Sequence, residues 1–365
     1  MFDQPMLNYL SIVAITFVVA LVAVAWFVPY VRDFAQRIGA VQEGGGRRVH
    51  SGAMPNIGGI AIYGGFIVAL LVGSLVSPSA LDAFRVELLA IVIGATLMTL
   101  VGFIDDMWEV PATVRLAAQC VAAGILVVNG VTIDYVTNYF GESGYLFFGE
   151  TLSVLLTLVW VVGFTNAFNF IDGLDGLSSG VATISSLALL AVAVQFPDRG
   201  AAVLLLAALA GSALGFLRHN FNPATIIMGD SGAYLLGYLL AAVSVLGALK
   251  VTATVTVVTP MLVLALPVLN ITQVTLRRLR RGVSPAEAGN DHLHDLIRIR
   301  SGSKRLTVVV LWLVTLAFGA LGMMLSRTPP GLMTLTIAVT VILIATVSYL
   351  RLREVARERR VVVGD

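Results

Sequence analysis

The sequence has a single cysteine, Cys120, and few charged residues. One cysteine excludes an internal disulfide and a metal site built from several cysteines. Charged residues make up 12% of the 365 residues and hydrophobic residues 58%, whereas soluble domains carry about 25% charged residues. Mean hydropathy is +0.93 and the net charge is only +2. These values exclude a soluble globular protein, a disordered chain and a nucleic-acid-binding protein with a broad basic face. They predict a polytopic membrane protein.

Apolar runs long enough to cross a bilayer, which takes roughly 20 residues, occur eleven times. The predicted spans are 7–29, 57–77, 86–104, 112–130, 151–165, 177–196, 201–217, 231–249, 253–275, 306–325 and 331–350. The sequence contains no stretch long and polar enough for a separate soluble domain. We therefore predict the all-α fold class: a single membrane-embedded helical bundle over residues 1–365, with a basic loop at 276–305 and a basic tail at 351–365.

The distribution of Lys and Arg predicts the orientation of these spans. If the loops alternate between the two sides of the membrane, 19 of the 23 Lys and Arg residues fall on one side and four on the other. Because basic residues gather in cytoplasmic loops, the N-terminus is predicted outside and the C-terminus in the cytoplasm. The expected location is the plasma (inner) membrane. Aromatic residues of the outer loop 131–150 are expected to anchor at the interface.

Polar clusters fall on the predicted cytoplasmic side. Asp105-Asp106 ends the third span, Asn166 to Gly176 follows the fifth, Asp230 opens the eighth, and His292 and His294 lie in the basic loop. Since nothing in the assignment of the spans requires this, we interpret the clusters as one site assembled from several helix ends. Carboxylates from separate segments suit Mg²⁺, which takes oxygen ligands and retains several waters.

Each cluster also has a structural explanation. A solvated helix end explains Asp105-Asp106, a glycine-rich turn explains residues 169–176, and a helix cap explains Asp230. We favour a functional role because adjacent carboxylates flanked by apolar residues repel each other and require a cation or a proton. Close helix packing is the favoured explanation for Gly58-Gly59.

Basic residues beside the histidines predict binding of an anion. The loop contains, among others, Arg277 and Arg281, and Arg48 and His50 form a second basic patch on the same side. Contact with anionic membrane lipids explains the arginines equally well. Carboxylates with Mg²⁺ facing basic groups at a membrane surface fit phosphoryl transfer between a water-soluble and a lipid-borne substrate.

Five motifs resemble the polyprenyl-phosphate N-acetylhexosamine-1-phosphate transferase family, of glycosyltransferase family 4 type. The matching stretches are Arg48-Val-His50 with Pro55 and Gly58-Gly59, Gly102-Phe-Ile-Asp105-Asp106, Asn166-Ala-Phe-Asn169-Phe-Ile-Asp172-Gly-Leu-Asp175-Gly-Leu, Met228-Gly229-Asp230-Ser231-Gly232, and Arg277 to Pro285 leading to Asp291-His292-Leu-His294. The form of the histidine motif is nearest to the undecaprenyl-phosphate GlcNAc-1-phosphate transferase branch. Two departures leave the sugar open: Asp295 stands where that branch has a histidine, and Asn270 where many relatives carry Asp.

The resemblance implies transfer of a sugar-1-phosphate from a UDP-N-acetylhexosamine to a polyprenyl phosphate, with release of UMP. It also implies Mg²⁺, or Mn²⁺ as a substitute, a homodimer, no nucleic-acid partner, and a role in the first membrane step of a cell-envelope polysaccharide, such as lipopolysaccharide.

The resemblance also suggests roles for individual residues. The expected metal ligands are Asp230 and one of Asp105 and Asp106, while the other of this pair orients or deprotonates the lipid phosphate. The remaining assignments are catalytic Asp172 and Asp175, and substrate-binding Arg48, His50, Asn166, Asn169, His292, His294, Arg277 and Arg281.

Two alternative functions remain open. A phospho-MurNAc-pentapeptide transferase shares the reaction type, and a transporter shares the multi-span architecture. Transporters, however, bind their substrates near the bilayer midplane, whereas these clusters lie at one face.

Overall fold

The computed structural model describes residues 4–42, 53–76, 85–137, 145–248, 258–282 and 292–363. Within these ranges the chain forms thirteen helices. Their bounds are α1 Gln4–Ile38, α2 Gly59–Val76, α3 Arg85–Trp108, α4 Ala112–Val128, α5 Glu150–Ile171, α6 Leu177–Ala193, α7 Gly200–Asn220, α8 Gly229–Ala248, α9 Val258–Val263, α10 Ala265–Arg280, α11 Leu293–Ser301, α12 Lys304–Leu325 and α13 Pro330–Val363.

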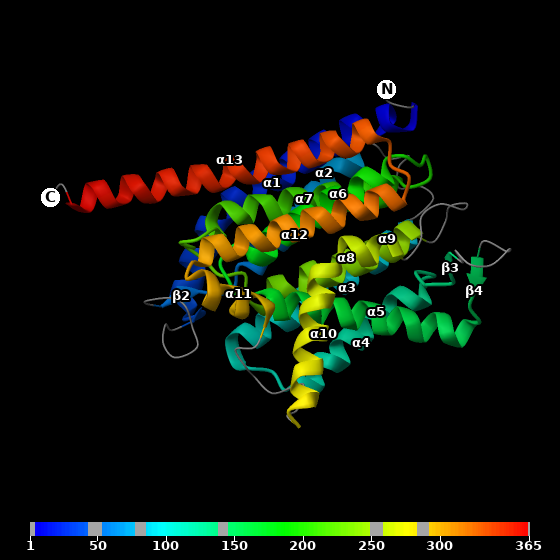
Figure 1. Ribbon diagram of the computed structural model, residues 1–365, viewed down its shortest axis with the longest axis horizontal. Helices are drawn as coiled ribbons and strands as arrows, with labels where there is room; N and C mark the ends of the chain where they lie inside the picture. Colours follow the sequence, from blue (N-terminus) through cyan, green and yellow to red (C-terminus); the bar gives the residue numbers. More distant parts are fainter. Residues whose placement is uncertain are drawn as a thin grey trace.

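Most of the helices lie along the long axis of a bundle, with the first turns of α1 and the last turns of α13 toward opposite ends of that axis (Figure 1). Eight helices in the described ranges are long and apolar enough to cross a membrane, and α4 and α6 are shorter apolar helices. This confirms a helical multi-pass membrane protein. The side of the membrane that each end faces, and the number of spans, stay predictions.

The centre of the bundle is formed by α7 and α8. The apolar window of α7 is completely buried and that of α8 is 89% buried, as expected for helices that are apolar on every face. Around them α1 packs on α7, while α3 and α5 pack on α8. The centre therefore fixes the position of Asp230, which lies in the first turn of α8.

The predicted span 253–275 is not one continuous helix. Over its described part the structure has α9 and α10, divided at Leu264, and α10 runs at a steep angle to the bundle (Figure 1). Pro267 explains the break, because its ring clashes with the carbonyl of the residue four positions earlier, which is Val263. The Ser185 hydroxyl donates to this carbonyl at 3.1 Å, so the interrupted helix leaves no orphaned acceptor there.

Two short antiparallel ribbons were not predicted from the sequence. One pairs β1 (Val41–Gln42) with β2 (Met54–Pro55), and the other pairs β3 (Tyr135–Thr137) with β4 (Tyr145–Phe147). On the second ribbon, the ring of Tyr135 on β3 contacts the rings of Tyr145 and Phe147 on β4 at 5.5 Å between centroids, and the latter two rings lie 6.1 Å apart. The ribbon lies at the end of the bundle opposite the C-terminus (Figure 1).

Glycines bring three helices into backbone contact near the start of α8. A Cβ on Gly59 of α2 would lie 2.1 Å from the Gly232 nitrogen, and one on Gly102 of α3 would lie 2.4 Å from the Ser231 Cα. The close-packing interpretation of Gly59 is thus confirmed. Because α2 and α3 lie directly against this turn, the end of α3 reaches the groups at the start of α8.

Candidate active site

Asp106 caps the N-terminus of α8. Its Oδ1 accepts a hydrogen bond from the Asp230 N–H at 2.7 Å, and its Oδ2 accepts one from the Ser231 N–H at 3.1 Å. A helix N-terminus leaves such N–H groups without intrahelical partners and attracts negative charge. Gly229 has a φ of +72°, and a Cβ there would lie 2.5 Å from Asp106 Oδ2. The glycine before Asp230 is therefore required for this contact.

Asp105 has different partners, although it is the next residue. It is buried, and its Oδ2 accepts hydrogen bonds from Arg115 at 3.0 Å and Tyr234 at 3.1 Å. Its Oδ1 accepts from the Val110 N–H at 2.7 Å. Protein donors thus engage both oxygens of Asp105, and Arg115 neutralises its charge.

Asp230 lies where α3, α5 and α8 meet. Asn169, near the end of α5, donates from Nδ2 to Asp230 Oδ1. Electrostatic repulsion reaches Asp230 from Asp105, and reaches Asp106 and Asp172 from Asp230. The structure therefore brings together carboxylates that the sequence places up to 125 residues apart.

Asp172 follows the last residue of α5, and the motif continues from there as a turn up to the start of α6. Removal from water, helped by the negative charges of Asp230 and Asp175, raises the pKa of Asp172 to about 7. Such a carboxyl group favours a proton or a cation at physiological pH.

Two of the predicted site residues, Asp175 and Asn166, form hydrogen bonds that connect one part of the fold to another. Asp175 is buried, and its Oδ2 accepts from Asn222 Nδ2 at 2.9 Å and from the Ala224 N–H at 3.2 Å. Asn166 exchanges hydrogen bonds with Gln119 of α4 at 2.6 and 3.3 Å. Asp175 fixes the connection between α7 and α8, and Asn166 joins α4 to α5.

His292 and His294 stack on each other, with ring centroids 5.3 Å apart and planes at 4°. His292 precedes α11 in an extended conformation and His294 lies in its first turn. His294 approaches the Asp172 turn closely, because a Cβ on Gly173 would lie 2.2 Å from His294 Nε2. Burial lowers the pKa of His294 to about 4, although Asp295 lies nearby. The buried histidine is therefore neutral at physiological pH.

Asn270 of α10 connects the histidine segment to α5. Its Oδ1 accepts from the Leu293 N–H at 2.9 Å, and its Nδ2 donates to the Phe170 carbonyl at 3.3 Å. The same Nδ2 lies 3.4 Å from His292 Nδ1. An aspartate could not donate to the Phe170 carbonyl, so this departure from many relatives has a structural consequence. Asp295, the other departure, pairs with Arg298 at 3.2 Å.

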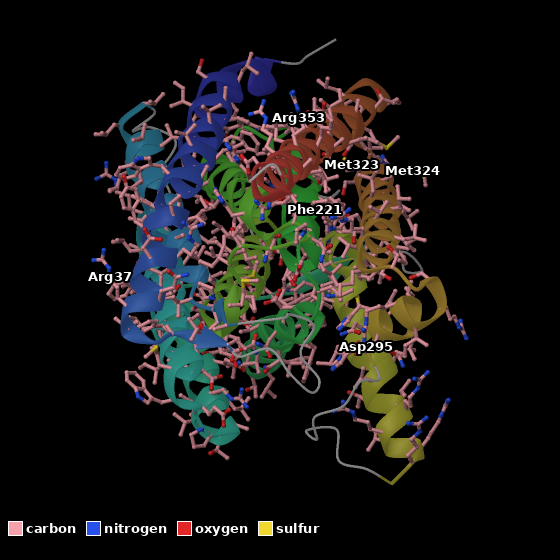
Figure 2. The ribbon with its side chains drawn as sticks, turned by 90° about the vertical axis from the view of Figure 1, so that its left-hand side faces the viewer. Arg37, Phe221, Asp295, Met323, Met324 and Arg353 are labelled. Atoms are coloured by element: carbon pink, nitrogen blue, oxygen red, sulfur yellow. The ribbon has the colours of Figure 1, made fainter. Side chains whose placement is uncertain are left out.

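The remaining predicted residues lie elsewhere. Arg277 and Arg281 line a groove of about 500 Å³ along the far part of α10, which projects from the bundle (Figure 1). Arg48 and His50 lie outside the described residues. Figure 2 views the bundle from the end that carries the site and shows Asp295 where α11 approaches α10.

Two partners of Asp105, Arg115 and Tyr234, were not predicted from the sequence. Arg115 is the only charged residue of an otherwise apolar helix, a signal that points to a buried ion pair. Tyr234 lies one helical turn after Asp230, which places both side chains on the same face of α8.

The side chains around Asp230 suit a hard divalent cation. In the described part of the chain no three His, Cys, Asp or Glu side chains stand in metal-binding geometry. The Asn169 amide nevertheless contacts Asp230, and the charge of Asp230 reaches Asp172. Rotating the Asn169 amide by 180° would direct its oxygen, in place of its nitrogen, toward Asp230. Oxygen ligands with room for water are what Mg²⁺ prefers, so these residues fit this ion.

Together, the fold and the site define a multi-pass membrane protein whose carboxylates and histidines meet at one end of a helical bundle. Residues 88–248 match the family model described as glycosyl transferase family 4.

Three relatives extend this similarity over most of the chain. A probable undecaprenyl-phosphate N-acetylglucosaminyl 1-phosphate transferase of Bacillus subtilis is 32% identical over 87% of this chain and 85% of its own length. A decaprenyl-phosphate N-acetylglucosaminephosphotransferase of Mycolicibacterium smegmatis is 34% identical over 87% and 83%. An undecaprenyl-phosphate alpha-N-acetylglucosaminyl 1-phosphate transferase of Escherichia coli K12 is 25% identical over 82% and 80%.

The chain belongs to glycosyl transferase family 4, in the branch of polyprenyl-phosphate N-acetylglucosamine-1-phosphate transferases. It is therefore a sugar-phosphate transferase.

Proposed function

We propose that this protein transfers N-acetylglucosamine-1-phosphate from UDP-N-acetylglucosamine to a polyprenyl phosphate and releases UMP. The observation that carries the proposal is the convergence of Asp106, Asp172 and Asp230 at one end of the bundle, together with the names of the relatives. We place this end at the cytoplasmic face of the plasma membrane, where a soluble nucleotide meets a lipid-borne phosphate. The product would begin a cell-envelope polysaccharide, including lipopolysaccharide where the cell makes one.

Asp230, Asp172 and Asn169 are the residues we assign to Mg²⁺. When bound, the ion would neutralise charge on the donor diphosphate. This division of roles differs from the one expected from the sequence, because protein donors already engage both oxygens of Asp105 and of Asp106. Asp106 then acts by fixing the first turn of α8, and with it Asp230.

The acceptor phosphate needs orientation more than it needs a base. A phosphate monoester has a second pKa near 6, so it is largely a dianion at neutral pH. In the proposed step an oxygen of this phosphate bonds to the sugar-bearing phosphorus, the bond from that phosphorus to the bridging oxygen breaks, and UMP leaves with the electron pair. Holding the two phosphates in line supplies much of the rate acceleration.

His292 and His294 suit the donor side of the site. The neutral His294 can donate one hydrogen bond, and it lies against the Asp172 turn at Gly173 while its ring stacks on that of His292. The arginines of α10, Arg277 and Arg281, would attract anions to the groove beside them.

The test is a panel of UDP-sugars supplied to purified protein with decaprenyl or undecaprenyl phosphate and Mg²⁺, read out as UMP. We expect UMP with UDP-N-acetylglucosamine, and none when the lipid is omitted or the metal is chelated. Release with UDP-N-acetylgalactosamine alone would change the sugar. Release with UDP-MurNAc-pentapeptide alone would assign the protein to peptidoglycan synthesis. No UMP from any donor would contradict the proposal.

A further inference from the structure

Residues 221–228 connect α7 to α8, and this connector contacts the candidate site on one side. Its middle is bound by Asp175, which accepts from Asn222 Nδ2 and the Ala224 N–H. Its last residues hydrogen-bond to the segment before α2, through Ile227 N–H to Pro55 O at 2.8 Å and Gly59 N–H to Met228 O at 2.9 Å. The chain then enters α8 and reaches Asp230. The position of this connector therefore influences both Asp175 and Asp230.

Arg351 of the last helix, α13, holds the connector from its opposite side. Its Nε and Nη2 donate to the Pro223 carbonyl at 3.1 and 2.9 Å, and the side chain is 6% exposed. Glu354, one turn further along α13, lies 3.7 Å from Arg351 and accepts from Arg218 of α7 at 2.5 Å.

Burying the guanidinium group of Arg351 costs free energy, because the group loses hydration that its hydrogen bonds must replace. Much of α13 is exposed, because only 17% of its apolar window is buried. Its C-terminal half extends past the bundle at the end that carries the site (Figure 1). Arg351 thus links this helix to the eight-residue connector, which a site carboxylate, Asp175, binds on the other side, and the two contacts together set the position of the connector.

We propose that Arg351 is a positioning residue, which fixes the α7–α8 connector through the Pro223 carbonyl and thereby holds Asp175 and Asp230 in place for transfer. The inference rests on the proposed function for its kinetic consequence. Its structural consequence, a firmly held connector, does not depend on any activity.

The test compares Arg351→Ala and Arg351→Lys with Arg353→Ala. Arg353 is a matched control, since it lies two residues further along the same helix, is exposed, and contacts the Tyr349 ring. Hydrogen exchange of residues 221–228 is measured by mass spectrometry in detergent, and kcat and KM are measured by UMP release. A lysine can still donate to one carbonyl but cannot donate twice from a fixed fork.

We expect Arg351→Ala to speed exchange of the connector about tenfold, as fits the loss of hydrogen bonds from a charged donor. We also expect kcat to fall about tenfold or more, with KM changed less than about twofold. Arg351→Lys should lie between the alanine variant and wild type, and Arg353→Ala should match wild type.

Two results would overturn the inference: connector exchange that is unchanged in Arg351→Ala, or wild-type kcat in that variant, whether or not KM changes. If the alanine variant does not fold, the exchange and kcat of the lysine variant decide. If wild-type protein releases no UMP from any donor, the proposed function fails, while the exchange experiment still tests the tether.

Discussion

Replacing Asp106 with Asn removes the charge at the N-terminus of α8 while keeping the shape of the side chain. The carboxylate accepts one N–H on each oxygen, from Asp230 at 2.7 Å and Ser231 at 3.1 Å. Asparagine has one acceptor oxygen, so it retains one of these bonds and turns its own N–H₂ toward the other donor. The first turn of α8 must then shift, and Asp230 shifts with it.

The magnitude follows from the two interactions lost. A hydrogen bond to a charged group contributes about 1.5–3 kcal/mol, and a charge at a helix N-terminus typically about 0.3–1 kcal/mol. A loss of about 2–4 kcal/mol, if it all falls on the transition state, lowers kcat/KM by roughly 30- to 1,000-fold. We expect Asp106→Asn to lie in this range.

The assay is UMP release by purified protein, with elution volume and thermal midpoint in detergent as checks of folding. Asp33→Asn is the matched control, because Asp33 is 57% exposed and pairs only with its neighbour Arg32 among the ion pairs of the described chain. This control should retain wild-type kcat/KM. A folded Asp106→Asn variant with wild-type kcat/KM would refute the idea that the charge on Asp106 places Asp230.

Further predictions concern the turn after α5 and the buried histidine. Gly173→Ala should abolish transfer, since its Cβ would meet His294 Nε2 at 2.2 Å, whereas Gly163→Ala on the open face of α5 should leave activity unchanged. Because the pKa of His294 is lowered to about 4, the unfolded chain binds a proton there that the folded protein does not between about pH 6.5 and 4. The thermal midpoint should therefore decrease as the pH is lowered from about 6.5 to 4, and it should decrease less steeply in His294→Gln. The same dependence of the midpoint on pH in both proteins would contradict a buried neutral histidine. The pKa of Asp172 near 7 means that protons compete with Mg²⁺ below neutral pH. Stabilisation by Mg²⁺ should be larger at pH 8 than at pH 6, and this difference should disappear in Asp172→Asn; stabilisation that is equal at both pH values in wild type would argue against Asp172 as a ligand.

The sequence predicts the helices well because hydropathy reports burial in lipid or protein, and each of the eleven expected spans contains a helix. It also places the polar clusters at span ends, where they meet in the structure. The division of the 253–275 span was missed, although Pro267 provides a physical signal for it: a residue without an N–H inside a helix costs the bond to Val263. An apolar run long enough to cross a bilayer does not by itself indicate a straight helix.

Pairing of polar groups could not be predicted from the sequence. Asp105 and Asp106 are adjacent and chemically identical, yet one accepts from Arg115 and the other from the backbone of α8. Side chains on neighbouring helical positions point about 100° apart, so each carboxylate faces a different helix. Which helix that is depends on packing, set here by glycines such as Gly102, which brings α3 against the first turn of α8.

The membrane explains why the site is built from helix ends. Inside a lipid-embedded helix every backbone N–H and C=O is already paired, so only the ends offer backbone groups to side chains or ligands. Asp106 binds the free N–H groups of α8, Asp172 stands just beyond the end of α5, and His292 stands just before α11. The connector before α8 is likewise held by side chains, from Asp175 on one side and Arg351 on the other. Rigid helices joined by tethered ends keep several charged groups in register without a soluble domain, and a change at one tether is therefore transmitted to Asp230 through the backbone at the start of α8.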